Sequence, residues 1–487
     1  MSELHELLTL PKLPITKDYY IKTLQYYLSN GIPATYTLEN VIEYNNTDTG
    51  RTLNLTTNTT PLHTLSRSIS LLSNGYNTDY LKDGMLNIDT VDDQQATKLK
   101  MYPVTKRLSS GYEFNEEECQ TILDIINLLF EYGAGWNFLD FENKTIGNLI
   151  YNEGIGSVTA VAASANNTIL LNNIYLRFVE AGIATELLFR KVEEVEWIEE
   201  KEEKEIEREE EEEEEEEKTA AATEEQMNKN TNNLDIQEQN PADNQSVFLE
   251  TPLEYTDSSL ITKNNKDGVM MDWESDIMHI AAETVLSSAY QEANDKECIN
   301  VLNIGFGMGI IDAFIENICA SNNDKKKYRH YICEAHPDVI ARFENDPIWS
   351  KNPNIILLKG RWQDTLNTIL DQGDIFFDGI YYDTFSEHYN QDMLNDLYDV
   401  VVGLLKPKGV FSFFNGLGAD NPFFYDVYKE IVVLDLQNYG LTCEYKLIKL
   451  DSSAENCKKN NGDIVWDGVK QSYFNCKYYY HPKISFM

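Results

Sequence analysis

A glycine-rich stretch is the feature of this sequence best suited to binding a ligand. Gly305-Phe306-Gly307-Met308-Gly309 follows the apolar run 300–304 directly and precedes a helical pattern. Glycines at such a turn allow a ligand to approach the backbone closely at the helix N-terminus. The spacing is GxGxG, because Ile310 stands where the dinucleotide fingerprint GxGxxG has its third glycine. The stretch therefore favours an adenosyl ligand without a pyrophosphate.

Polar residues follow three further apolar runs. Glu334 ends the run that starts at Tyr328, and a carboxylate there can accept hydrogen bonds from both ribose hydroxyls. Lys359-Gly360-Arg361-Trp362 ends the next run, and Trp362 is placed to pack on the adenine. Asp383 follows the run 375–382, at the sheet edge where ligands bind. Together these positions predict S-adenosylmethionine, rather than NAD, as the cofactor.

A second group of candidates lies before the glycine-rich stretch. Met270 and Met278 are candidates to flank a sulfonium ligand, and Glu274 follows Trp273 in an arrangement suited to lining a pocket. His388, five residues after Asp383, is a rival base, with a solvated loop histidine as the alternative.

These positions require a parallel sheet to bring them together. Short apolar runs alternate with helical periods from residue 247 to the end, the pattern of βαβ units. We expect strands at 300–304, 328–333, 355–358, 375–382 and 409–414. The predicted C-terminal domain, 247–487, is thus a doubly wound, Rossmann-like α/β domain of the class I methyltransferase type.

Residues 1–190 are predicted to form an all-α domain. Thr60-Pro61-Leu62-His63 has a capping residue and a proline suited to a helix start. An apolar helical face from Ile122 stops at Gly133, and the following Gly-Ala-x-x-Asn-x-x-Asp pattern resembles the ankyrin repeat. Weaker echoes occur at 27–31 and 178–182. We expect ankyrin-like repeats with insertions, and the alternative is another all-helical domain.

An acidic segment separates the two predicted domains. It includes nine consecutive glutamates, Glu209–Glu217, and continues into a polar stretch with almost no apolar residues. Such a composition cannot bury enough apolar surface to fold. We therefore expect a solvated linker over 191–246, which acts either as a solubilising spacer or as an attractor for a basic substrate protein.

The composition narrows the possible partners and compartments. The 487 residues carry a formal net charge of −41, which disfavours direct binding to nucleic acid and favours a basic partner. No apolar run is long enough to span a bilayer, and the first residues do not resemble a signal peptide. Seven dispersed cysteines without a CxxC pair indicate reduced thiols in a cytoplasmic or nuclear protein, and we predict no metal site.

The C-terminal motifs resemble those of guanidinoacetate N-methyltransferase. The resemblance lies in the segments 269–278, 301–311, 359–364, 378–385, 405–410 and 476–482. With the ankyrin-like N-terminal half, the chain resembles the fungal protein arginine delta-N-methyltransferases, called type IV. This resemblance implies methyl transfer to the internal guanidino nitrogen of arginine in a protein, with ribosomal proteins as the expected substrate class.

The resemblance also implies which residues form the site. Glu274 and Asp383 would be the catalytic carboxylates that grip the terminal nitrogens of the guanidinium. The implied cofactor contacts are Tyr255, Met270, Phe306, Gly307, Met308, Gly309, Ile310, Ile311, Glu334, Ala335, His336, Arg361, Trp362 and Asp383. Ala335-His336 departs from the Asn or Asp that guanidinoacetate enzymes have after the glutamate, which leaves only backbone contacts expected at these two positions.

Two other functions fit the same sequence. A methyltransferase for a small guanidino compound would use the same site but would need no N-terminal reader domain. A non-catalytic ankyrin scaffold with a vestigial cofactor domain is opposed by the complete set of glycines and carboxylates in the C-terminal domain.

Overall fold

The computed structural model divides the chain into two compact units, Met1–Ala222 and Thr223–Met487. It describes residues 3–37, 40, 58–75, 111–150, 166–191, 245–291, 298–321, 327–385, 391–450, 466, 468–470 and 472–487. Most of the predicted acidic linker lies outside these residues, so its boundaries remain predictions. Among the described residues, no helix combines the length and apolar character needed to cross a membrane.

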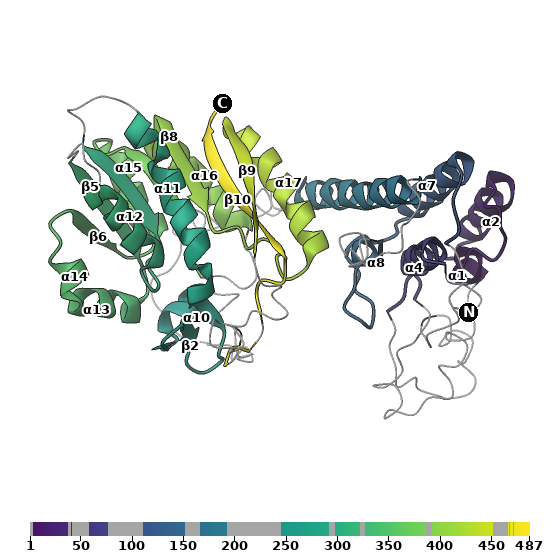
Figure 1. Cartoon of the computed structure of the whole chain (residues 1–487), viewed down its shortest axis with the longest axis horizontal. Coiled ribbons are helices and arrows are strands. Elements are labelled where there is room, and N and C mark those ends of the chain that lie inside the picture. Colours follow the sequence, from purple (N-terminus) through teal and green to yellow (C-terminus); the bar gives the residue numbers. More distant parts are fainter. Residues whose placement is uncertain are drawn as a thin grey trace, which may run out of the picture. The chain divides into compact units, whose positions relative to one another are not determined.

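The described part of the N-terminal unit is helical (Figure 1). Its helices are α1 (Glu3–Leu8), α2 (Lys17–Ser29), α4 (Pro61–Ser73), α7 (Glu116–Glu131), α8 (Ile146–Ile150) and a helix over 166–191. Thr60 caps α4 in a capping box with His63, and Pro61 takes the first helical position, as the sequence predicted. Helix α7 ends before Gly133, which adopts φ +83°.

The N-terminal unit confirms helices rather than a repeat type. Leu62, Leu65 and Ile69 of α4 are buried, and the buried Arg67 pairs with Asp140. Gly182 lies inside the helix over 166–191, so the expected repeat echo at 178–182 does not mark a helix end. A single glycine costs a helix only about 1 kcal/mol, and a long helix tolerates that cost. The ankyrin-like assignment therefore remains a prediction.

A seven-stranded sheet forms the centre of the C-terminal unit (Figure 1). The strand order is β6-β5-β4-β7-β8-β10-β9, with β10 antiparallel to both of its neighbours and the first five strands parallel. Its strands are β4 (Ile299–Ile304), β5 (Tyr328–Glu334), β6 (Ile355–Lys359), β7 (Phe377–Tyr382), β8 (Leu405–Phe413), β9 (Leu441–Lys449) and β10 (Tyr478–Phe486). All five predicted strands are present, which confirms the Rossmann-like α/β fold.

Helices pack on both faces of this sheet because its strands are apolar on both sides. Val301, Ile332 and Tyr381 face a core formed with α11 (Ser275–Gln291), α12 (Ile310–Ser321) and α13 (Pro337–Asn345). The other core contains their neighbours in sequence, Leu302, Tyr331 and Ile380, whose side chains point to the opposite face. The helices of that second core are α15 (Trp362–Gln372), α16 (Gln391–Leu404) and α17 (Pro422–Asn438).

A small antiparallel sheet precedes the large one and was not predicted. It contains β1 (Leu253–Tyr255), β2 (Ser259–Thr262) and β3 (Gly268–Met271), preceded by the short helix α10 (Gln245–Glu250). Strand β3 leads into the single 3₁₀ turn η2 (Asp272–Glu274), which delivers Glu274 before α11 begins. A further short helix, α14 (Pro347–Ser350), lies between α13 and β6.

Candidate active site

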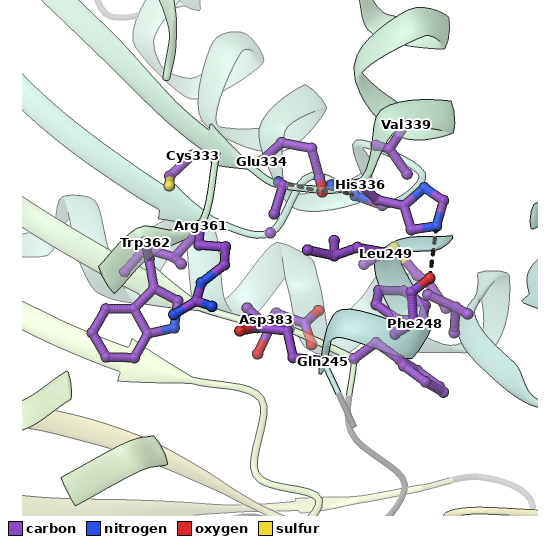
Figure 2. A pocket seen from close by; sticks show the side chains of 18 of the residues that line it. Gln245, Phe248, Leu249, Cys333, Glu334, His336, Val339, Arg361, Trp362 and Asp383 are labelled. Atoms are coloured by element: carbon purple, nitrogen blue, oxygen red, sulfur yellow. Dashed lines mark hydrogen bonds between the residues drawn. The ribbon is translucent and has the colours of Figure 1, made fainter. Parts of the chain in front are cut away.

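A pocket opens at the carboxyl ends of β4 to β7 (Figure 2). It holds about 700 Å³ of empty space, a volume that includes open solvent at its mouth. The predicted residues that line it are Met270, Gly307, Glu334, Ala335, His336, Arg361, Trp362 and Asp383. The parallel sheet therefore brings residues from four separate strand ends to one cavity, as expected for this fold class.

The glycine-rich loop between β4 and α12 is tightly packed at Gly305 and Gly307. Gly305 adopts φ +96°, and a Cβ there would lie 1.9 Å from the Asp383 carbonyl oxygen. Gly307 adopts φ +53°, and its Cβ would come within 3.0 Å of the Met270 side chain. Met270 Sδ in turn lies 3.3 Å from the backbone nitrogen of Met308. The loop is thus packed against both Asp383 and Met270.

Glu334 connects the end of β5 to this loop. Its Oε1 accepts the backbone N–H groups of Ala335 and His336, at 2.8 and 2.7 Å. Its Oε2 accepts those of Phe306 at 2.9 Å and Gly307 at 3.4 Å. Four backbone donors thus occupy the carboxylate, so ribose hydroxyls would have to share or replace some of these bonds. The predicted ribose contact remains a prediction.

Helix α10 contributes pocket residues that the sequence reasoning missed. Gln245, Phe248 and Leu249 line the cavity, and Phe248 stacks on Phe385 with ring centroids 4.5 Å apart. His336 holds this segment through a hydrogen bond, because its Nε2 lies 3.2 Å from the Phe248 carbonyl oxygen (Figure 2). An apolar triplet, 247–249, directly after a polar stretch is the only sequence signal for this segment.

His336 thus has a role that its sequence position did not reveal. Its Nδ1 accepts the backbone N–H of Asp338, so Nε2 carries the proton and donates to the carbonyls of Phe248 and Thr251. The side chain therefore connects α13 to the segment that contains α10, in addition to lining the pocket.

Several predicted cofactor contacts lie in the loop or the core and do not line the cavity. The Phe306 ring packs against Phe343 and Trp349, with centroids 5.1 Å from each. Tyr255 donates its hydroxyl to the Gly307 carbonyl at 3.1 Å. The others that do not line the cavity are Met308, Gly309, Ile310 and the buried Ile311. These six residues shape the loop, and their contacts with the cofactor remain predictions.

Asp383 lines the cavity and is half-buried, whereas Glu274 is buried and does not line the cavity, although the charge of Asp383 acts on it. Glu274 is 3% exposed, and burial together with the negative charge of Asp383 raises its pKa well above the ordinary value. Burial and the nearby charge of Asp312 raise the pKa of Asp383 to about 7. Asp383 Oδ2 is buried without a hydrogen-bond partner. Within the described residues, no lysine or arginine forms an ion pair with either carboxylate.

Glu274 accepts a hydrogen bond from Tyr473, a residue that the sequence reasoning did not select. Tyr473 lies 199 positions away in the sequence, so no local spacing connects the two. The rival base His388 lies outside the described residues.

The comparisons with known proteins agree with this geometry. The model of the guanidinoacetate N-methyltransferase family matches residues 239–485. A Saccharomyces cerevisiae protein named protein arginine N-methyltransferase 2 is 45% identical, and the match covers 100% of both chains. Proteins of the same name from Kluyveromyces lactis and Debaryomyces hansenii are 46% and 39% identical, again over 100% of both chains.

The residues of the pocket fit the cofactor of such enzymes. The cavity is surrounded by backbone N–H groups, by Glu334 and by the apolar side chains of Met270, Leu260 and Phe248. This lining suits an adenosyl group and the sulfur-containing chain attached to it. S-adenosylmethionine is the cofactor of this domain. The chain belongs to the fungal family named protein arginine N-methyltransferase 2, and its C-terminal unit is a methyltransferase domain related to guanidinoacetate N-methyltransferase.

Proposed function

We propose that this protein methylates the delta nitrogen, the internal guanidino nitrogen, of arginine residues in a protein substrate. The observation that carries the proposal is a pair of carboxylates that interact electrostatically: Asp383, which lines the cofactor pocket, and the buried Glu274. Two such carboxylates without a cation among the described residues are costly, and a bound cation relieves that cost.

Arginine is the side chain that fits this pair. Its guanidinium is planar, carries five N–H donors and stays protonated at all physiological pH values. Two carboxylates can accept hydrogen bonds from the two terminal nitrogens and draw the positive charge towards them. The internal nitrogen is then the electron-rich one, which supports transfer to the delta position.

The same pair can manage the proton that the reaction releases. A guanidinium must lose a proton before one of its nitrogens can act as a nucleophile. Asp383, whose pKa is raised to about 7, is suited to accept that proton near neutral pH. Glu274 would then remain the partner that holds the charge of the product.

The remaining residues of the site bind and orient. S-adenosylmethionine, when bound, supplies an electrophilic methyl group on a sulfonium. The glycine-rich loop fixes one wall of the cavity, and Met270 and Asp383 contact that loop directly. Holding the reacting groups in the correct geometry supplies much of the acceleration in such transfers.

The proposed substrate is a basic protein, with ribosomal proteins as the class that we favour. The chain's net charge of −41 attracts basic partners, and the names of its relatives support a protein-arginine substrate. The helical N-terminal unit would select the substrate. We also propose a cytoplasmic and nuclear location, which the six unpaired cysteines among the described residues support.

A small guanidino compound is the second candidate substrate. It is favoured by the family model, which matches residues 239–485 and is named for an enzyme of guanidinoacetate. The N-terminal unit would then have a function other than substrate selection.

Transfer of radiolabelled methyl from S-adenosylmethionine distinguishes these candidates. The full-length protein is incubated in parallel with ribosomal protein extract and with guanidinoacetate. We expect label in protein, strongly reduced but still measurable in Glu274→Gln. Label in guanidinoacetate alone would support the small-molecule function, and cofactor binding without any transfer would support the non-catalytic scaffold.

A further inference from the structure

Tyr473 stands in direct contact with one of the two proposed catalytic carboxylates. It lies in the described stretch 472–477 before β10, and its hydroxyl donates a hydrogen bond to Glu274 Oε1. The backbone of Met271 provides a second bond to the same carboxylate. In the part of the chain that the structure describes, Tyr473 is the side chain that donates to Glu274.

Aromatic packing fixes the Tyr473 ring in place. The Trp466 ring meets it edge-on, with centroids 4.8 Å apart, and Trp273 lies at 6.3 Å. The ring also lies against Gly268, where a Cβ would come within 2.9 Å of the Tyr473 Cε1 atom. Because the ring is confined on several sides, the Tyr473 oxygen is held beside the Glu274 carboxylate.

The acidic surroundings of Glu274 disfavour its ionised form, so hydrogen-bond donors such as Tyr473 are needed to stabilise that form. Among the described residues, the ionisable groups found to interact with it are acids: Asp272 on η2, Asp383 after β7, Tyr381 on β7, Tyr479 on β10 and Tyr473 itself. Burial and the charge of Asp383 raise the pKa of Glu274, whereas the Tyr473 and Met271 hydrogen bonds lower it. Burial and Glu274 also raise the pKa of Tyr473 well above its usual value, so its hydroxyl keeps its proton and remains a donor.

We propose that Tyr473 is a positioning residue that orients the Glu274 carboxylate and stabilises its negative charge for binding of the substrate guanidinium. The inference rests on the proposed function, in which Glu274 grips that guanidinium. Tyr473 acts through Glu274 and does not itself exchange a proton with the substrate.

The Tyr473→Phe variant tests this role with little change in packing, because the ring remains. Initial rates at a low concentration of ribosomal protein extract report relative kcat/KM. A hydrogen bond to a charged group contributes about 1.5–3 kcal/mol, so we expect a roughly 10- to 100-fold loss at pH 7. The loss should shrink as the pH rises, because hydroxide then ionises Glu274 without the help of Tyr473.

Tyr328→Phe is the matched control. Tyr328 donates to Glu316 Oε2 at 2.9 Å, which is also a tyrosine-to-glutamate bond, but it lies at the start of β5, whereas the pocket lies at the carboxyl ends of the strands. We expect this control to retain wild-type rates at every pH. Both variants should retain wild-type affinity for S-adenosylhomocysteine in calorimetry, which shows that the cofactor pocket is folded.

A double-mutant cycle shows whether Tyr473 works through Glu274. In a Glu274→Gln background, Tyr473→Phe should cause no further loss. Full additivity of the two losses, a loss that is the same at all pH values, or wild-type rates in Tyr473→Phe would each overturn the inference. Absence of transfer by the wild-type protein would instead overturn the proposed function, so the two failures are distinguishable.

Discussion

Methyl transfer to an arginine substrate should depend steeply on pH below neutrality, because the substrate cation must replace a proton on the Glu274–Asp383 carboxylate pair. The substrate guanidinium does not titrate in this range. The pKa of Asp383 is raised by burial and by the charge of Asp312, so Asp383 is protonated in the free protein below pH 7. Binding a guanidinium there requires that the proton leave.

The size of the effect follows from the pKa of Asp383. Its rise from 3.8 to about 7 corresponds to roughly 4 kcal/mol in favour of the protonated form. Each pH unit well below 7 therefore adds about 1.4 kcal/mol to the cost of ionising the site, which is a tenfold loss. For this group alone, we expect kcat/KM to fall about fivefold from pH 7 to 6 and to approach a tenfold fall per pH unit below pH 6. The raised pKa of Glu274 acts in the same direction.

The assay measures initial rates of methyl transfer at low substrate concentration from pH 5.5 to 9.5. Asp383→Asn should lose about 2–5 kcal/mol of transition-state stabilisation, which lowers kcat/KM roughly 30- to 5,000-fold. The fall in kcat/KM below pH 7 should also disappear in this variant. Asp378→Asn is the matched control. Asp378 lies on β7, five residues earlier, and pairs with Lys406 at 2.8 Å outside the pocket.

A profile that is flat from pH 6 to 8 in the wild-type protein would refute this reasoning. A limb that persists unchanged in Asp383→Asn would also do so, because another group would then be responsible for it.

Two further predictions concern stability and cofactor binding. Gly305→Ala should abolish measurable binding of S-adenosylhomocysteine in calorimetry, because its Cβ would lie 1.9 Å from the Asp383 oxygen; Gly440→Ala, also at positive φ but with open space around its Cβ, should bind normally. Burial alone would lower the pKa of His330, but hydrogen bonds and charges of Asp312 and Glu316 raise it to about 9. The pKa of His330 is higher in the folded protein than in the unfolded chain, so protonated His330 stabilises the fold fully below pH 6.5. This stabilisation is lost as the pH rises through 9, and the free energy of unfolding measured in urea should then fall by about 3 kcal/mol. His330→Gln should not show this loss; equal losses in both proteins would contradict the assignment.

The parallel sheet and the loop could be predicted from sequence because their signals are local. Each of the five predicted strands is a short apolar run, and the structure places strands at all of them. Gly305 and Gly307 follow the first run directly, and a parallel sheet necessarily brings Glu334 and Asp383 to the same edge. Side-chain identity and position at the end of a strand were sufficient for these residues.

The parts that could not be predicted depend on contacts between distant segments. Tyr473 reaches Glu274 only because β10 inserts between β8 and β9, and no spacing rule describes that insertion. Helix α10 has six residues and none is fully buried, so it has no amphipathic period to detect. Phe306 was expected at the cofactor, but its ring turns to Phe343 and leaves only its backbone at the loop.

Identifying the guanidino nitrogen that receives the methyl group is the most direct test of the proposed function. Ribosomal protein labelled by the full-length protein is hydrolysed to amino acids, and delta-methylarginine is separated from omega-methylarginine. The account predicts label in delta-methylarginine, reduced strongly in both Asp383→Asn and Glu274→Gln. Label in omega-methylarginine, or delta label that survives both substitutions, would contradict the proposal that this carboxylate pair grips the terminal nitrogens and exposes the internal one.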